Sequence, residues 1–236
     1  MSFIATLAEA SIRPLETQWE WDRYGPLLLE SIGQTLWMVT ATLFFGGLGG
    51  LIVGMALYVT RRGGIAASRV ANAALNIVVN FFRPIPFIVF LAVIAPFTSF
   101  VVGTYIGTSA AIVPLSIATT FGFSRIVEQN LVTVQPGVIE AARAAGAGPW
   151  RIILTLLVPE ALGPLILGYT FVFVAIVDMT AVAGAVGAGG LGSFALQYGF
   201  RRWDFVTLWI AVGLIIVLVQ LGQYLGNTLA RKVLRR

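Results

Sequence analysis

Few side chains in this sequence could do chemistry, and Asp178 is the most unusual of them. The 236 residues include no cysteine and no histidine, which excludes thiol chemistry, the common zinc ligands and a histidine general base. Asp178 lies within a long apolar run, where an ionised carboxylate is costly unless it is paired or hydrated. Two interpretations stay open. Either Thr180, the backbone or water satisfies this carboxyl group, or Asp178 contacts a positive group of a bound molecule.

A glycine-rich stretch follows Asp178 and matches a nucleotide-binding pattern by letter. Residues 187–192 read G-x-G-x-x-G, but that pattern binds a dinucleotide only between a strand and a helix. Here it follows a hydrophobic helix, so we interpret it as a tight turn close to a translocation path, with Gly187, Gly189 and Gly190 as candidate residues. The sequence also lacks the G-x-x-x-x-G-K-S/T pattern, so any ATP that drives this protein binds to another chain.

The third candidate is a polar, alanine-rich segment between two hydrophobic runs. We expect one helix to start at Pro136 and to end near Gly146, and a second to start at Pro149 and to end at Pro159. The alanines leave a narrow, smooth surface that could fit a groove, and the glycine allows a sharp turn. An ordinary amphipathic loop helix is the plainer alternative. The candidate docking residues are Glu140, Ala141, Ala142, Arg143, Gly146 and Pro159.

The elements that would position these residues are membrane-spanning helices. Hydrophobic residues make up 58% of the chain and charged residues 11%, with a mean hydropathy of +0.91, whereas a soluble domain has about 25% charged residues. The apolar runs predict an all-α membrane protein with five spans, separated by loops that include one long loop at 125–160. The expected spans are about 31–59, 84–102, 106–124, 162–184 and 205–227.

The domain organisation is simple. We expect residues 1–30, which are acidic and contain several aromatic side chains, to form an N-terminal surface segment, and residues 31–236 to form one transmembrane domain. The segment at 61–83 reads as a loop, and Pro84 and Pro86 should lie in the first turn of the span that follows. Gly46, Gly50 and Gly54 are four residues apart, which favours close packing of the first span against another helix.

The basic residues indicate the orientation of the spans. Eleven of the fifteen lie in the 61–83 segment, the 125–160 loop or the C-terminal end, and cytoplasmic loops are usually the basic ones. Five spans place the two termini on opposite sides, so we expect a cytoplasmic C-terminus and an external N-terminus. The basic residues do not gather on one amphipathic face, so the net charge of +5 does not indicate nucleic acid binding.

The polar segment resembles the EAA motif of permease subunits of bacterial ABC importers. Glu140-Ala141-Ala142, then Gly146, then Leu156, Val158 and Pro159 follow that motif's spacing, with Leu156 and Val158 as conservative changes. A wider resemblance to methionine-uptake permeases covers about residues 31–236. It includes Phe82-Arg83-Pro84-Ile85-Pro86 and the glycine stretch up to Gln197-Tyr198-Gly199, whereas Asp178 stands where those permeases carry an uncharged residue.

This resemblance implies a multi-pass permease in the bacterial inner membrane that imports methionine or a related amino acid by alternating access. It implies a homodimer with two ABC ATPase subunits, which bind ATP and Mg, and an extracytoplasmic substrate-binding protein. The chain itself would have no catalytic residue, no cofactor and no metal, and would not be an enzyme. Two other functions are weaker: an ion-coupled secondary transporter that uses Asp178, and a membrane scaffold that transports nothing.

Overall fold

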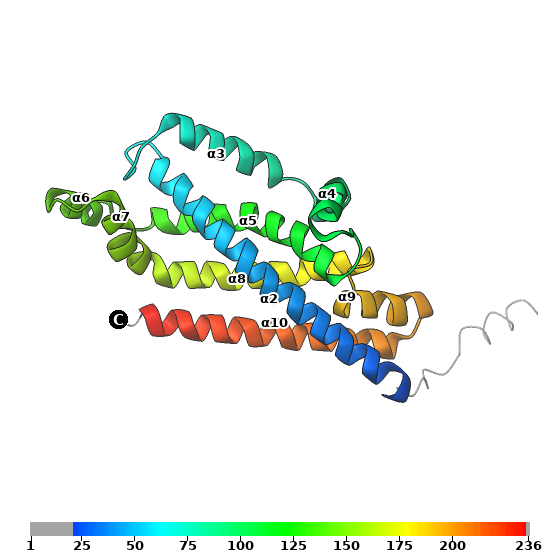
Figure 1. The fold of residues 1–236 in the computed structure, drawn as a ribbon. Coiled ribbons are helices and arrows are strands. Elements are labelled where there is room, and N and C mark those ends of the chain that lie inside the picture. The colour runs from blue at the N-terminus through cyan, green and yellow to red at the C-terminus, as the bar shows by residue number, and fades with distance from the viewer. Residues whose placement is uncertain (1–20, 235–236) are drawn as a thin grey trace, which may run out of the picture.

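The computed structural model describes residues 21–234, and these residues form helices without any strand. Four helices are long and apolar enough to cross a membrane, and a sharply bent pair supplies a fifth candidate span. The longer helices are α2 (Trp21–Thr60), α3 (Arg69–Phe82), α4 (Phe87–Val102), α5 (Thr108–Val132), α8 (Val158–Ala185) and α10 (Phe205–Leu234). In Figure 1, α2, α3, α5, α8 and α10 lie alongside one another, whereas α4, which is turned by 110° from α3, is seen nearly end-on.

The first span is longer than the sequence predicts. Helix α2 has 40 residues and begins at Trp21, so residues 21–30 are helical and continuous with the span that the sequence places at about 31–59. Tyr24 and Leu28 explain the extension, because both are buried against Leu191 and Phe194 in a small apolar cluster. Residues 1–20 of the expected surface segment lie outside the described residues.

The glycines of α2 allow it to pack tightly against α5. A Cβ atom at Gly46 would lie 2.8 Å from the carbonyl oxygen of Ser116, and one at Gly50 would lie 2.8 Å from Cβ of Phe123. A Cβ atom at Gly54 would likewise lie too close to the carbonyl oxygen of Ser124. The prediction of close helix packing from this spacing is therefore confirmed.

The segment at 61–83 is not the loop that the sequence suggested. It contains α3, a 14-residue helix that Ser68 caps by accepting the amide of Ala71. Proline at 84 and at 86 prevents the helix from continuing, because proline lacks an amide donor and restricts the residue before it. The chain bends by 110° there, and Pro86 is the N-cap of α4, so neither proline lies in the first turn of a straight span. With 16 residues, α4 is shorter than the roughly 20 needed to cross a bilayer.

The long loop is shorter than predicted at both ends. Helix α5 continues to Val132, eight residues past the expected end at 124. After α6 (Pro136–Ala144), the chain is helical from Pro149 to Ala185. This stretch comprises α7 (Pro149–Ile152), a π-helical turn η1 (Ile153–Leu157) and α8.

Pro159 therefore does not end a helix, as the sequence predicted. The amide of Val158, the residue before it, donates to the carbonyl of Ile153, five positions back, as in a π-helix. Because the backbone hydrogen bonds before Pro159 already span five residues, the helix continues past Pro159 although proline has no amide donor.

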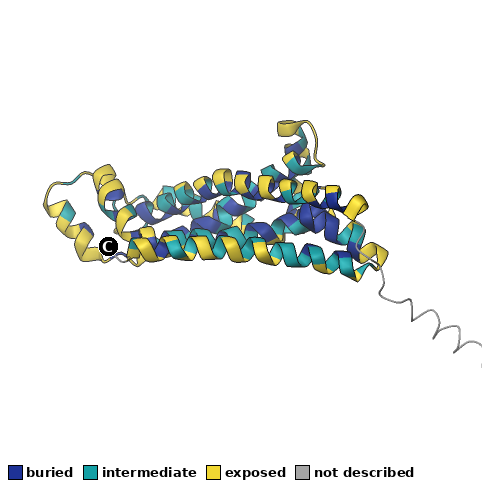
Figure 2. Cartoon of the chain, turned by 90° about the horizontal axis from the view of Figure 1, so that it is seen from below, coloured by how far each residue is buried: buried dark blue, intermediate teal, exposed yellow. Residues whose placement is uncertain are grey.

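The two ends of the bundle differ in their elements. Helix α6 and the C-terminal end of α10 lie at one end, and the start of α2 and helix α9 (Gly190–Phe194) lie at the other (Figure 1). Helix α9 continues into η2 (Ala195–Gly199) and η3 (Phe200–Arg202), short helical turns that the sequence did not predict. Figure 2 shows buried residues concentrated between the long helices, and exposed residues over α6 and α7.

Candidate functional site

Helix α6 is a short knob that is anchored to the bundle on one side. Ile139 is 8% exposed and belongs to the same apolar cluster as Tyr58 and Leu157. The guanidinium of Arg143 donates to the carbonyl oxygen of Gly64 at 2.7 Å, which ties α6 to the loop after α2. These contacts hold the helix in a defined position relative to α2 and α8.

The outer surface of α6 is small and polar. Glu140 and Ala141 are exposed, while Ala142 packs partly against the core. Gly146 has a φ of +79°, in the left-handed region that favours glycine, and its amide donates to the carbonyl of Arg143 at 2.9 Å. The next amide, of Ala147, donates to Ala142 at 3.0 Å and closes the turn. The structure thus brings five of the predicted docking residues onto one knob, whereas Pro159 lies apart from it in α8.

Two large apolar side chains extend the exposed surface beside this knob. Trp150 in α7 is 75% exposed and Leu154 in the π turn is 64% exposed. Trp150 was part of the segment that the sequence singled out, but neither residue was predicted as a docking residue. Their exposure beside α6 is a signal that only the structure provides.

Asp178 lies exposed on α8, and no hydrogen bond or ion pair joins it to any other described residue. The hydroxyl of Thr180 is buried and donates to the carbonyl of Val177 at 2.7 Å. Thr180 therefore does not satisfy the carboxyl group of Asp178 in this structure, as one of the two interpretations from the sequence supposed.

The glycine turn is a packed structural element. Gly187, Gly189 and Gly190 all have positive φ values, of 98°, 81° and 81°. The amide of Gly190 donates to the side-chain oxygen of Gln34 at 2.6 Å, and the next amide, of Leu191, donates to Thr35 at 2.8 Å. Two side chains of α2 thus cap the N-terminus of α9, which sequence reasoning missed because 156 residues separate the partners.

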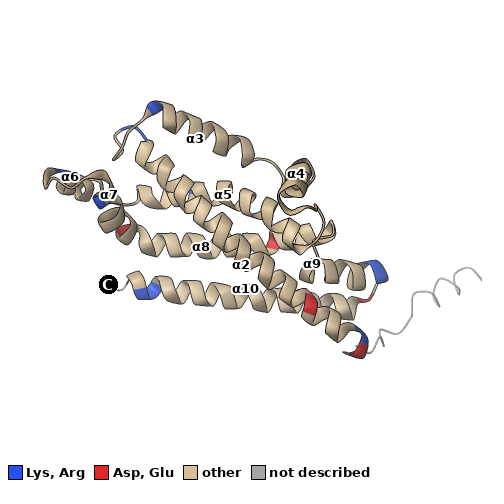
Figure 3. Cartoon of the chain, in the orientation of Figure 1, with Lys and Arg blue, Asp and Glu red and all other residues tan. Residues whose placement is uncertain are grey.

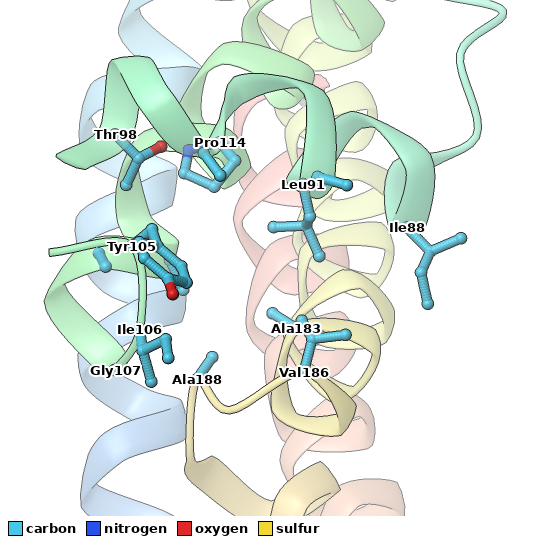
Figure 4. A pocket seen from close by; sticks show the side chains of 14 residues that line it. Ile88, Leu91, Thr98, Tyr105, Ile106, Gly107, Pro114, Ala183, Val186 and Ala188 are labelled. Atoms are coloured by element: carbon cyan, nitrogen blue, oxygen red, sulfur yellow. The ribbon is translucent and has the colours of Figure 1, made fainter. Parts of the chain in front are cut away.

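An apolar cavity of about 280 Å³ lies beside this turn. Figure 4 shows side chains of α4, α5 and the end of α8 around it, with the phenol of Tyr105 among aliphatic groups. Val186 and Ala188, neighbours of the predicted glycines, contribute to the wall, whereas Asp178 does not line it. The structure therefore separates the predicted path residues: the glycine turn borders the cavity and Asp178 lies elsewhere on α8.

The described residues contain no group of three or more acidic, histidine or cysteine side chains that could hold a metal ion. Figure 3 shows that the acidic and basic residues lie mainly near the two ends of the bundle, with few charged residues along the helices. The fold and this charge distribution define a multi-pass membrane protein with an anchored, exposed helix, α6, at one end.

The chain belongs to the family of binding-protein-dependent transport system inner membrane components, whose model matches residues 46–235. A probable D-methionine transport system permease protein, MetI, of Vibrio cholerae is 42% identical over 88% of this chain and 92% of its own length. The methionine import system permease protein MetP of Bacillus subtilis is 36% identical over 76% of this chain and 81% of its own.

A solved structure shows the same fold. It is described as an inward-facing conformation of the MetNI methionine ABC transporter, and it matches with a TM-score of 0.87 and 41% identity. The match covers 89% of this chain and 97% of the other. The all-helical permease fold is therefore shared along nearly the whole described chain.

Proposed function

We propose that this chain is the permease subunit of an ATP-driven importer that takes up methionine or a related amino acid. The carrying observation is a match over nearly the full length of proteins described as methionine permeases, together with an anchored, exposed α6. A permease of this family moves its cargo without changing a covalent bond in it, so the chain is a transport subunit and not an enzyme.

The α6 end of the bundle is proposed to face the cytoplasm. Arg61, Arg62 and Arg143 lie at this end with Arg231 and Lys232 of α10, and an excess of such residues is typical of cytoplasmic surfaces. The N-terminus is then external, as the sequence predicted, and the whole chain lies in the bacterial inner membrane. The sequence grouped Arg83 with these cytoplasmic basic residues. In the structure Arg83 is the C-cap of α3, about 20 Å along that helix from Arg69.

Helix α6 is proposed to be the coupling helix that docks on a partner ATPase. Ala141 leaves a low profile that can enter a groove, Glu140 offers a charge at its rim, and Gly146 closes the turn behind it. Arg143 acts from the other side by holding the knob to Gly64. Pro159 supports the docking loop at a distance, at the start of α8 after the π turn.

The translocation path is proposed to include Asp178, Thr180 and the glycine turn of Gly187, Gly189 and Gly190. The support for Asp178 is physical: a carboxylate without a partner among the described residues is tolerated in a span only against water or a positive charge. The α-ammonium group of an amino acid would supply that charge in transit.

The remaining partners follow from this function. ATP and Mg belong to two ATPase subunits, cargo arrives on an extracytoplasmic binding protein, and two copies of this chain form the permease. ATP-driven closure of the ATPases would move α6 and switch the path between its two sides.

One reconstitution tests the proposal against its rivals. Proteoliposomes that contain the permease, its ATPase and the binding protein should take up methionine only with hydrolysable ATP. Gly146→Asp and Glu140→Lys should each abolish ATPase binding, because the first strains the turn and the second reverses the charge at the rim. Uptake that an ion gradient drives without ATP would instead identify a secondary transporter, and absence of both would favour the scaffold.

A further inference from the structure

Helix α3 is attached to the bundle in an unusual way. Val79 is its one buried residue in the described structure, while Val70, Ile77 and Phe81 are 81%, 70% and 66% exposed. Its polar side chains are spaced by four residues and occupy one face, at Asn72, Asn76 and Asn80. In a bilayer, apolar faces give helices little reason to associate, and polar contacts between helices weigh more. The asparagine face therefore supplies the polar attachment of α3, beside Val79 and the stacked rings of Phe82 and Phe121.

Arg125 of α5 is at the centre of this attachment. Its guanidinium donates to the amide oxygens of Asn76 at 2.6 Å and Asn80 at 2.8 Å. It also forms an ion pair with Glu128 at 2.6 Å, and the side chains of Arg125 and Glu128 are only 14% and 20% exposed. The pairing neutralises the arginine locally, so its remaining donors are directed to α3.

The asparagines extend this network to α2. Asn76 donates to the carbonyl of Asn72 at 2.8 Å, and Asn72 donates to the carbonyl of Leu57 at 3.0 Å and to the hydroxyl of Thr60 at 3.1 Å. Hydrogen bonds of this kind can exchange partners without opening a packed apolar core. The network thus holds α3 against both α5 and α2.

The position of Arg125 in the chain connects two parts that a permease must move together. It lies in the last third of α5, which leads directly into α6 through residues 133–135. Helix α3 leads through the 110° bend into α4, which forms part of the wall of the apolar cavity. Arg125 is thus one contact through which a displacement near α6 can reach α3 and α4, beside the bond of Arg143 to Gly64 in the loop before α3.

We propose that Arg125 is a positioning residue for transport, which couples movement of α6 to the α3–α4 unit through Asn76 and Asn80. This inference rests on the proposed function, because it requires that α6 receives the ATPase movement. Arg125 touches neither cargo nor nucleotide. Its expected effect is on the amount of cargo moved for each ATP hydrolysed.

The test measures uptake and ATP hydrolysis together in proteoliposomes of the full complex, with methionine as the probe. Arg125→Gln should lower methionine uptake by about ten-fold, a size typical of coupling between sites. ATP hydrolysis should stay close to the wild-type rate, so the ratio of methionine to ATP falls. Asn80→Asp should act differently: a carboxylate in place of the amide oxygen that accepts from Arg125 strengthens the attachment, and hydrolysis and uptake should slow together.

Arg69→Gln is the matched control, because Arg69 is exposed at the first residue of the same helix and makes none of these bonds. It should leave the ratio unchanged. If Arg125→Gln does not assemble, the double variant Asn76→Ala with Asn80→Ala removes the hydrogen bonds from Arg125 to α3 and keeps both the arginine and its ion pair with Glu128. A wild-type ratio in an assembled variant of either kind overturns the proposal while the proposed function stands. Failure of the wild-type complex to take up methionine with ATP overturns both.

Discussion

Asp178 is unusual because it is a carboxylate within the long apolar helix α8. It is exposed about two turns before the end of α8, and no described residue pairs with it. The structure excludes Thr180 as its partner, because that hydroxyl bonds to Val177. The remaining possibilities are water in a path or a positive group that passes through it.

At this scale we predict that Asp178→Asn lowers methionine uptake by roughly ten-fold or more, because a hydrogen bond to a charged group is lost. Assembly with the ATPase should be unaffected, as Asp178 is remote from α6. Glu160→Gln is the control, since Glu160 is an exposed carboxylate at the other end of the same helix. Wild-type uptake by the Asp178→Asn complex would remove this residue from the path.

Between elements, small residues decide how closely helices approach. The pair α2 and α5 meets through Gly46, Gly50 and Gly54, and the turn before α9 fits against α2 through Gly189 and Gly190. At Gly46, Gly50 and Gly54 a side chain would meet backbone or Cβ atoms, which cannot rotate away, whereas at Gly189 it would meet the side-chain amide of Gln34. Packing of this kind stabilises a bundle where lipid removes most of the hydrophobic force between helices.

The prediction at the scale of elements compares two glycines of α2. Gly50→Ala should destabilise the purified permease by about 1–3 kcal/mol, because the new methyl group would overlap Cβ of Phe123. Gly33→Ala should stabilise it by about 0.5–1 kcal/mol, because no atom lies within 4 Å of that position and alanine favours the helix. Thermal unfolding in detergent measures both shifts. Equal shifts of the same sign would show that the α2–α5 contact is not tightly packed.

On the scale of the whole molecule, the two ends of the bundle differ in their elements and in their charged residues. Helix α6, the network around Arg125 and the basic C-terminal end of α10 lie towards one end, whereas Arg201 and Arg202 lie at the other. A protein that passes energy from one side of a membrane to the other needs such an asymmetry.

The sidedness can be measured because the chain has no cysteine of its own. Lys232→Cys should react with a membrane-impermeant maleimide only in inside-out vesicles, and Arg201→Cys only in intact spheroplasts. Both side chains are exposed, so accessibility depends on the side of the membrane alone. The reverse pattern would invert the proposed topology.

The sequence by itself determined the helical membrane class, four of the five spans, the glycine contact of α2 and the extent of α6. These features depend on local patterns: apolar run length, four-residue spacing, and proline or glycine at helix ends. Such patterns also carried the resemblance to importer permeases, because the EAA-like spacing is contained in one short segment.

Only the tertiary structure decided what α3 is and what holds it. The sequence predicted a loop for this segment. The structure shows a helix whose Asn76 accepts a hydrogen bond from Arg125, 49 residues away. Likewise, the caps from Gln34 and Thr35 on α9 join residues 156 positions apart. Contacts of this kind depend on how helices pack against one another, and no local pattern records that arrangement.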